Sequence, residues 1–149
     1  MFIRWLFAAL HLLALGIGMG AIWSRARALR PPLDSTGLKR VFYADTWWGI
    51  AALLWIGTGL VRAFGGLEKG TSYYVHNRLF LTKMALFVLI FILELRPMMT
   101  LIKWRARAAR GEVIDTSAAR TFARISLIQV GLLALIVLAA TAMARGYGL

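Results

Sequence analysis

The sequence predicts an all-α integral membrane protein, a four-helix bundle with up-down-up-down topology. Hydrophobic residues make up 60% of the 149 residues, and the mean hydropathy is +0.72. Both values exceed those of ordinary globular proteins. The charged residues also gather between four apolar runs, each long enough to cross about 30 Å of hydrocarbon as a helix. We therefore expect residues 1–149 to form a single transmembrane domain.

The four predicted spans have similar lengths and are joined by short connections. They cover about residues 5–23, 41–61, 79–95 and 125–143. The first apolar run is longer than the hydrophobic part of a secretory signal peptide, and Arg4 is the only basic residue before it. We therefore expect it to be retained as a span.

Two loops carry signals for helix ends. Pro31 and Pro32 break any helix that continues from the first span. Gly111 can end a helical extension that follows the third span. Candidate N-caps for the second and fourth helices are Asp34, Ser35, Thr36, Asp115, Thr116 and Ser117.

The basic residues predict the orientation in the membrane. Residues 24–40 hold five lysines and arginines and residues 96–124 hold seven, together twelve of the eighteen in the chain. Cytoplasmic loops carry the excess of these residues, so both termini and the middle loop should lie outside the cytoplasm. Because the basic loops flank apolar spans, we expect them to meet anionic lipid headgroups, not nucleic acid.

The third span carries polar residues on one face. At about 100° per residue, Lys83 lies about 20° from His76, and Glu94 returns to the angle of His76 after about five turns. Phe80 and Phe87 lie near the same stripe. This polar and aromatic face should point toward the other helices, although Lys83 can also extend toward the headgroups and His76 can be an interfacial residue.

The first span contributes a second histidine. His11 should lie about 9 Å below the outer surface, at nearly the same depth as Lys83. An imidazole in hydrocarbon needs a partner, such as a lysine, a hydroxyl, a metal or a ligand. We therefore predict an outward-facing polar pocket formed by His11, Lys83 and His76, with Arg78 at its outer edge.

A second polar cluster is expected near the cytoplasmic end. Asp45 lies near the start of the second span, and Glu94 and Arg96 lie at the end of the third. We expect these residues to form structural ion pairs, because the adjacent loops are rich in arginine. Gln129 in the fourth span should make a hydrogen bond between helices.

Two glycines of the first span form a GxxxG pair, Gly16 and Gly20. Such pairs let a second helix approach closely, and packing is the role expected here. The sequence contains no phosphate-binding loop, no HExxH motif and no recognisable nucleophile with its base. The sequence therefore leaves open whether the protein is an enzyme.

Histidines in a helical bundle can hold haem b through axial imidazoles. His76 should lie about 9 Å above His11, so Met84 or Lys83 is an alternative second ligand. A metal site without haem is not expected, because clustered acidic or sulfur ligands are missing. A proton relay through the ionisable residues would have gaps of several helical turns.

Three stretches resemble a bacterial membrane-protein family of unknown function, the domain-of-unknown-function family numbered 2214. They are "LFAALHLLALGIGMGAIWSR", "ADTWWGIAALL" and "YYVHNRLFLTKMALF". The resemblance covers roughly residues 5–143. It implies a four-span protein of the bacterial inner membrane and brings no established activity.

The sequence is also distantly similar to the HemJ-type protoporphyrinogen oxidases, small haem-binding membrane bundles. That resemblance implies a role for His11 in the first helix and Lys83 in the third. Those proteins also have a histidine near the end of the third helix, where this chain reads "FILELR" with Glu94. The resemblance therefore leaves the second haem ligand and the oxidase activity without support.

Two functions follow as hypotheses. In the first, the pocket binds haem b or a related porphyrin. In the second, the protein is a non-catalytic accessory subunit of a larger respiratory, photosynthetic or transport complex in the membrane. Small size, short outer loops and the GxxxG pair favour the second hypothesis.

Overall fold

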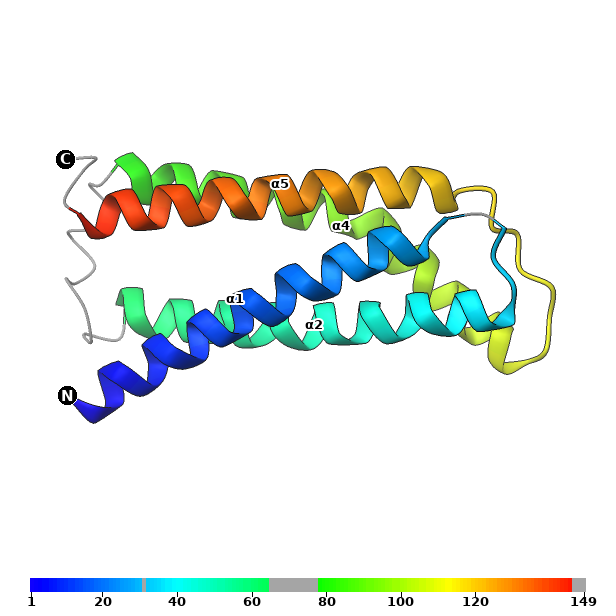
Figure 1. Cartoon of the computed structure of the whole chain (residues 1–149), viewed down its shortest axis with the longest axis horizontal. Helices are drawn as coiled ribbons and strands as arrows, with labels where there is room; N and C mark the ends of the chain where they lie inside the picture. Colours follow the sequence, from blue (N-terminus) through cyan, green and yellow to red (C-terminus); the bar gives the residue numbers. More distant parts are fainter. Residues whose placement is uncertain (31, 65–77, 146–149) are drawn as a thin grey trace.

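The computed structural model describes residues 1–30, 32–64 and 78–145, which form four long helices. These run side by side along the long axis of the molecule (Figure 1). Their bounds are α1 Phe2–Ala28, α2 Ser35–Phe64, α4 Arg78–Ala109 and α5 Ala119–Ala144. The prediction of an all-α helical bundle is confirmed.

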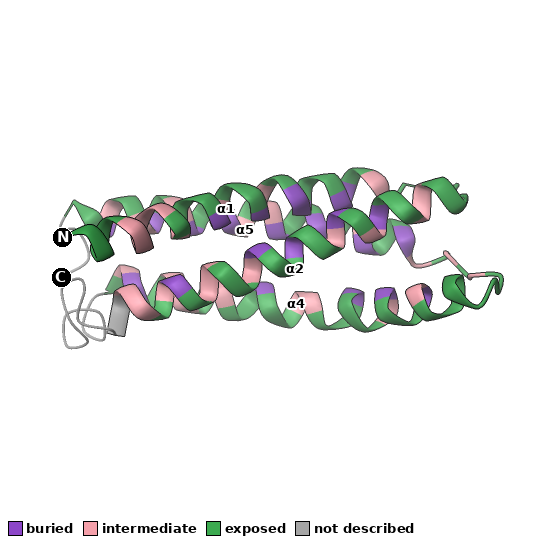
Figure 2. Ribbon diagram, turned by 90° about the horizontal axis from the view of Figure 1, so that it is seen from below, coloured by how far each residue is buried: buried purple, intermediate pink, exposed green. Residues whose placement is uncertain are grey.

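Three of the described helices, α1, α4 and α5, are long and apolar enough to cross a membrane. Helix α2 has 30 residues, but Asp45, Thr46 and Thr58 interrupt its apolar run. A membrane crossing by α2 stays a prediction. Exposed residues cover much of the outer surface of the bundle (Figure 2), and many are large apolar side chains such as Leu53 and Leu138. Lipid is the natural environment for such a surface.

Helix α1 connects the two halves of the bundle. It packs against α2 and α5, and α5 packs in turn against α4. The crossing of α1 over α2 is oblique (Figure 1). Two larger apolar clusters fill most of the interior of the described bundle, beside a small one formed by Phe80 and Met143. One contains Ala21, Ile22, Trp48, Ile90, Leu133 and Ile136, and the other contains Leu29, Val41, Leu101, Trp104, Ala119 and Phe122.

The close approach of α1 to α2 occurs at Gly18. A Cβ atom added there would lie 3.4 Å from the Ala51 Cβ and 3.6 Å from the Trp48 ring. Gly16 and Gly20 are exposed, and added Cβ atoms would meet nothing within 4 Å. The prediction that Gly16 and Gly20 form the packing face is therefore wrong within this chain, since two residues along a helix turn the side chain by about 200°.

The start of α2 follows the sequence prediction. The Asp34 Oδ1 atom accepts a hydrogen bond of 2.7 Å from the Gly37 backbone N–H. This is the N-cap interaction that satisfies an otherwise unpaired amide in the first turn.

The end of α4 is also as predicted. Gly111 has a φ of +70°, and its N–H bonds to the Ala108 carbonyl oxygen at 3.1 Å. The Glu112 N–H bonds to the Arg107 carbonyl oxygen at 3.0 Å. These two bonds form a Schellman motif, which requires the left-handed conformation that glycine adopts without strain.

The start of α5 differs from the prediction. Its N-cap residue is Ala118, which makes no side-chain cap. Asp115 instead accepts a hydrogen bond of 3.0 Å from the Ser117 backbone N–H within the preceding turn. That bond favours the ionised carboxylate and lowers the pKa of Asp115 below its ordinary value. The prediction of Asp115, Thr116 or Ser117 as the cap is wrong because the N-cap position falls one residue after the last of them, at Ala118, and the Asp115 carboxylate bonds within its own turn.

The contact at Gly18 gives a first prediction. Gly18→Leu should lower stability by about 1–3 kcal/mol, because the larger side chain would force α1 away from Ala51 and Trp48. Thermal unfolding in detergent, followed by tryptophan fluorescence, measures this loss. Gly16→Leu is the matched control and should leave the midpoint unchanged. Equal losses in both variants would contradict the assignment of the contact to Gly18.

Candidate functional site

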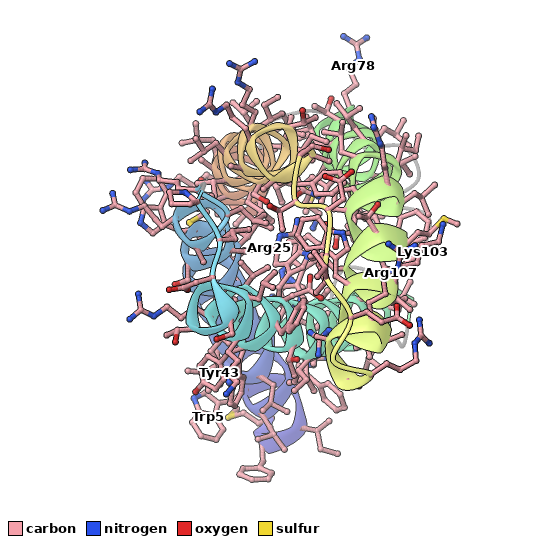
Figure 3. The ribbon with its side chains drawn as sticks, turned by 90° about the vertical axis from the view of Figure 1, so that its right-hand side faces the viewer. Trp5, Arg25, Tyr43, Arg78, Lys103 and Arg107 are labelled. Carbon is pink, nitrogen blue, oxygen red and sulfur yellow. The ribbon has the colours of Figure 1, made fainter. Side chains whose placement is uncertain are left out.

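A buried arginine connects all four helices. Arg25 of α1 has no exposed surface and lies between the helices (Figure 3). Its Nε donates to the Ser126 Oγ at 3.0 Å. Its Nη1 donates to the Asp45 Oδ1 and the Glu94 Oε2, both at 2.8 Å. Its Nη2 donates to the Glu94 Oε1 at 2.8 Å and the Gln129 Oε1 at 3.0 Å. These bonds match the five N–H donors of a guanidinium.

Gln129 extends this network between α4 and α5. Its Nε2 donates to the Ile90 backbone oxygen and to the Glu94 Oε1, both at 3.1 Å. The amide therefore holds the Glu94 carboxylate in place while it accepts from Arg25. The interhelical hydrogen bond expected of Gln129 is present.

A second arginine closes the network near the end of the bundle. The Arg105 Nη2 lies 3.3 Å from the Asp45 Oδ2 and donates to the Phe42 backbone oxygen at 2.7 Å. It also donates to the Thr46 hydroxyl at 2.9 Å. These hydrogen bonds from Arg105 link the C-terminal part of α4 to the first half of α2. Arg25 and Arg105 together balance the charges of Asp45 and Glu94.

The sequence predicts Asp45, Glu94 and Arg96 in this cluster, but it does not indicate Arg25. Asp45 and Glu94 both form ion pairs with Arg25. The guanidinium of Arg96 instead lies over the Phe122 ring, 5.9 Å from its centre. The first span was expected to end at residue 23, which made Arg25 a loop residue. Because α1 continues to Ala28, Arg25 remains inside the bundle beside the two acids.

A different polar group lies toward the other end of the bundle. The His11 Nδ1 atom is 2.9 Å from the Thr58 hydroxyl oxygen. That hydroxyl donates its own proton to the Leu54 carbonyl oxygen at 2.7 Å, so it accepts from His11. In the neutral imidazole the proton is therefore on Nδ1, and Nε2 keeps its lone pair.

The imidazole of His11 is fixed by its neighbours on α2. It stacks on the Trp55 ring with the centroids 5.3 Å apart and the planes at 14°. A Cβ atom added at Gly59 would lie only 3.0 Å from the His11 Cε1. Trp55 in turn contacts Phe87 of α4, with 5.6 Å between ring centroids. Glycine at position 59 thus leaves room for the ring.

His11 lines a cavity of about 490 Å³ to which all four helices contribute. Its walls are mainly apolar and include Trp55, Phe87 and Met84. Lys83 lies on the wall as well, with its Nζ 5.7 Å from the centre of the Phe80 ring. The structure therefore brings His11 and Lys83 to one cavity. His76, the third residue of the predicted pocket, lies outside the described residues.

Trp55, a residue of the cavity wall, has a buried polar atom without a partner in the described part of the chain. The Trp55 indole Nε1 is buried and has no hydrogen-bond partner among the described residues. A buried donor of this kind is uncommon and costs free energy unless another group accepts its hydrogen bond. Within the described ranges, no three histidine or acidic side chains are grouped so as to hold a metal ion.

Comparison with known protein families is decisive for the class of protein. The family described as "Predicted membrane protein (DUF2214)" matches residues 3–148. The chain belongs to this family. No curated protein and no solved structure matches the chain. The family description supports a membrane protein of unknown function, in agreement with the apolar helices.

The Arg25 network gives a second prediction. Arg25→Ala should lower stability by about 3–5 kcal/mol, because it leaves buried carboxylates without their counter-charge. Arg27→Ala is the matched control, since Arg27 is an exposed residue of the same helix. Unfolding in detergent can be compared for both variants. Similar stability of the Arg25 and Arg27 variants would rule out a structural role for the network.

Proposed function

We propose that the cavity at His11 binds haem b or a related metalloporphyrin, with the His11 Nε2 as an axial ligand. The supporting observation is the hydrogen bond from the His11 Nδ1 to Thr58. Histidines that bind metals commonly donate their other ring N–H to an oxygen, which fixes the tautomer and the orientation of the ring. Thr58 supplies this oxygen to His11.

The composition of the cavity supports a planar ligand with acidic substituents. Its volume of about 490 Å³ lies within the usual range for small-molecule sites. Trp55 and Phe87 offer aromatic surface to a flat ring system. Lys83 offers a cation to a carboxylate.

A second axial ligand would come from α4. Met84 lines the cavity, and a thioether is an established haem ligand opposite histidine. Lys83 is the alternative on the same helix. The proposal itself requires only His11, because haem proteins with one axial histidine are also stable.

The test uses absorption spectra of gently purified protein, oxidised and then reduced with dithionite. The wild-type protein should show a Soret band and sharp reduced α and β bands, and His11→Ala should lose them. Thr58→Val should weaken haem retention by roughly 10–100-fold, because it removes the oxygen that orients the imidazole.

Thr141→Val is the matched control for Thr58→Val. Thr141 also lines the cavity, but its hydroxyl donates to Val137 of its own helix at 2.9 Å. Haem content should therefore be unchanged in this variant. A featureless visible spectrum from intact wild-type protein, or the same haem content in His11→Ala, would overturn the proposal.

The accessory-subunit function is a second candidate, favoured by the outer face of α1. Gly16 and Gly20 form an exposed stripe with open space above it, and such stripes admit a second membrane helix. Mild solubilisation and native electrophoresis should then show a large complex that Gly16→Leu dissociates. A particle that runs only as a monomer or small homo-oligomer would exclude this function.

A further inference from the structure

A second cleft lies between the C-terminal end of α1 and the N-terminal end of α5. It has a volume of about 340 Å³. The two helix ends that form it lie at the end of the bundle opposite the N-terminus of α1 (Figure 1). Its apolar residues are Ala26, Leu29, Ala123 and Leu127. Leu29 is fully buried and joins α1 to the start of α5 by packing in the same cluster as Phe122.

Three arginines also line this cleft, Arg30 after α1 and Arg120 and Arg124 in the first turns of α5. All three are exposed, and none forms an ion pair with an acid of the described residues. The start of α5 has no side-chain cap, so the positive end of its helix dipole adds to the charge. The cleft thus combines three positive charges with an apolar surface.

The location of the cleft limits what can occupy it. It lies beyond the Arg25 network, where the apolar bundle gives way to the arginine-rich connections. Lipid phosphates lie at this level in a membrane, with acyl chains directly below them. Guanidinium groups bind phosphate through paired hydrogen bonds, and the apolar residues can contact the first methylene groups of the acyl chains.

We propose that this cleft binds an anionic phospholipid with two phosphates, a diphosphatidylglycerol. The charge balance favours two phosphates over one, since three arginines from two segments surround the cleft. Basic clefts between membrane helices are a known type of site for such headgroups. This site is independent of the His11 cavity, with which it shares no lining residue.

Native mass spectrometry tests the proposal on the purified full-length protein with added tetraoleoyl diphosphatidylglycerol. The wild-type protein should retain one molecule of this lipid per chain. A variant in which Arg30, Arg120 and Arg124 are all changed to glutamine should retain the lipid roughly 100-fold more weakly. Each arginine near an anionic lipid contributes on the order of fivefold to the binding affinity. Circular dichroism and the unfolding midpoint should stay unchanged, since the three side chains are exposed.

The matched control replaces Lys103, Arg107 and Arg110 with glutamine. This variant loses the same charge from α4 and the turn after it, and all three residues are exposed. It should retain the lipid as the wild type does. An equal loss of lipid retention in the two triple variants would show that the net charge of the protein alone attracts the lipid, and it would overturn the proposal. Equal retention of dioleoyl phosphatidylglycerol, which has one phosphate, would also overturn it.

Discussion

The buried guanidinium of Arg25 is the interaction on which the arrangement of the four helices depends. A charge inside an apolar bundle is costly unless every donor is satisfied and opposite charges are close. The carboxylates of α2 and α4 and the polar side chains of α5 meet both conditions. Because one side chain has partners on three other helices, a shift of any of them would leave a buried guanidinium N–H without its acceptor. The network therefore specifies position and register as well as contributing stability.

The two polar groups inside the bundle differ in a way that suits different roles. Around Arg25 every N–H donor of the guanidinium has an acceptor, so a ligand could bind the guanidinium only by breaking existing bonds. Around His11 the Nε2 lone pair has no hydrogen-bond partner among the described residues, and His11 lines a cavity. Saturated groups favour a structural role, whereas oriented groups with spare capacity favour binding. This contrast favours a structural role for the Arg25 network and a binding role for the His11 cavity.

Much of the architecture could be predicted from the sequence because it depends on local signals. The apolar runs located the helices, Asp34 marked the start of α2, and Gly111 marked the end of α4. Helical geometry also placed Lys83 and Phe87 on one face, and both line the His11 cavity. The signal failed at the start of α5, where Asp115 bonds within its own turn instead of capping the helix.

The remaining errors concern contacts between helices, which no local pattern determines. Gly16 and Gly20 fit a packing motif, yet the rotation of α1 presents Gly18 to α2. Arg25 resembled a loop arginine because hydropathy alone ended the first span two residues before it. Only the presence of Asp45 and Glu94 at the same level makes its burial favourable. The sequence predicts that a hydroxyl group can be the partner of His11, but it does not identify Thr58 as the residue that supplies it.

A double-mutant cycle between Arg25 and Glu94 tests the structural account most directly. Arg25→Gln and Glu94→Gln should each lower the free energy of unfolding by several kcal/mol, since each leaves a buried charge with fewer partners. The double variant should be more stable than the sum of the two losses predicts, by about 2 kcal/mol or more, because Arg105 still pairs with Asp45. Strictly additive losses would contradict the claim that this buried ion pair organises the bundle.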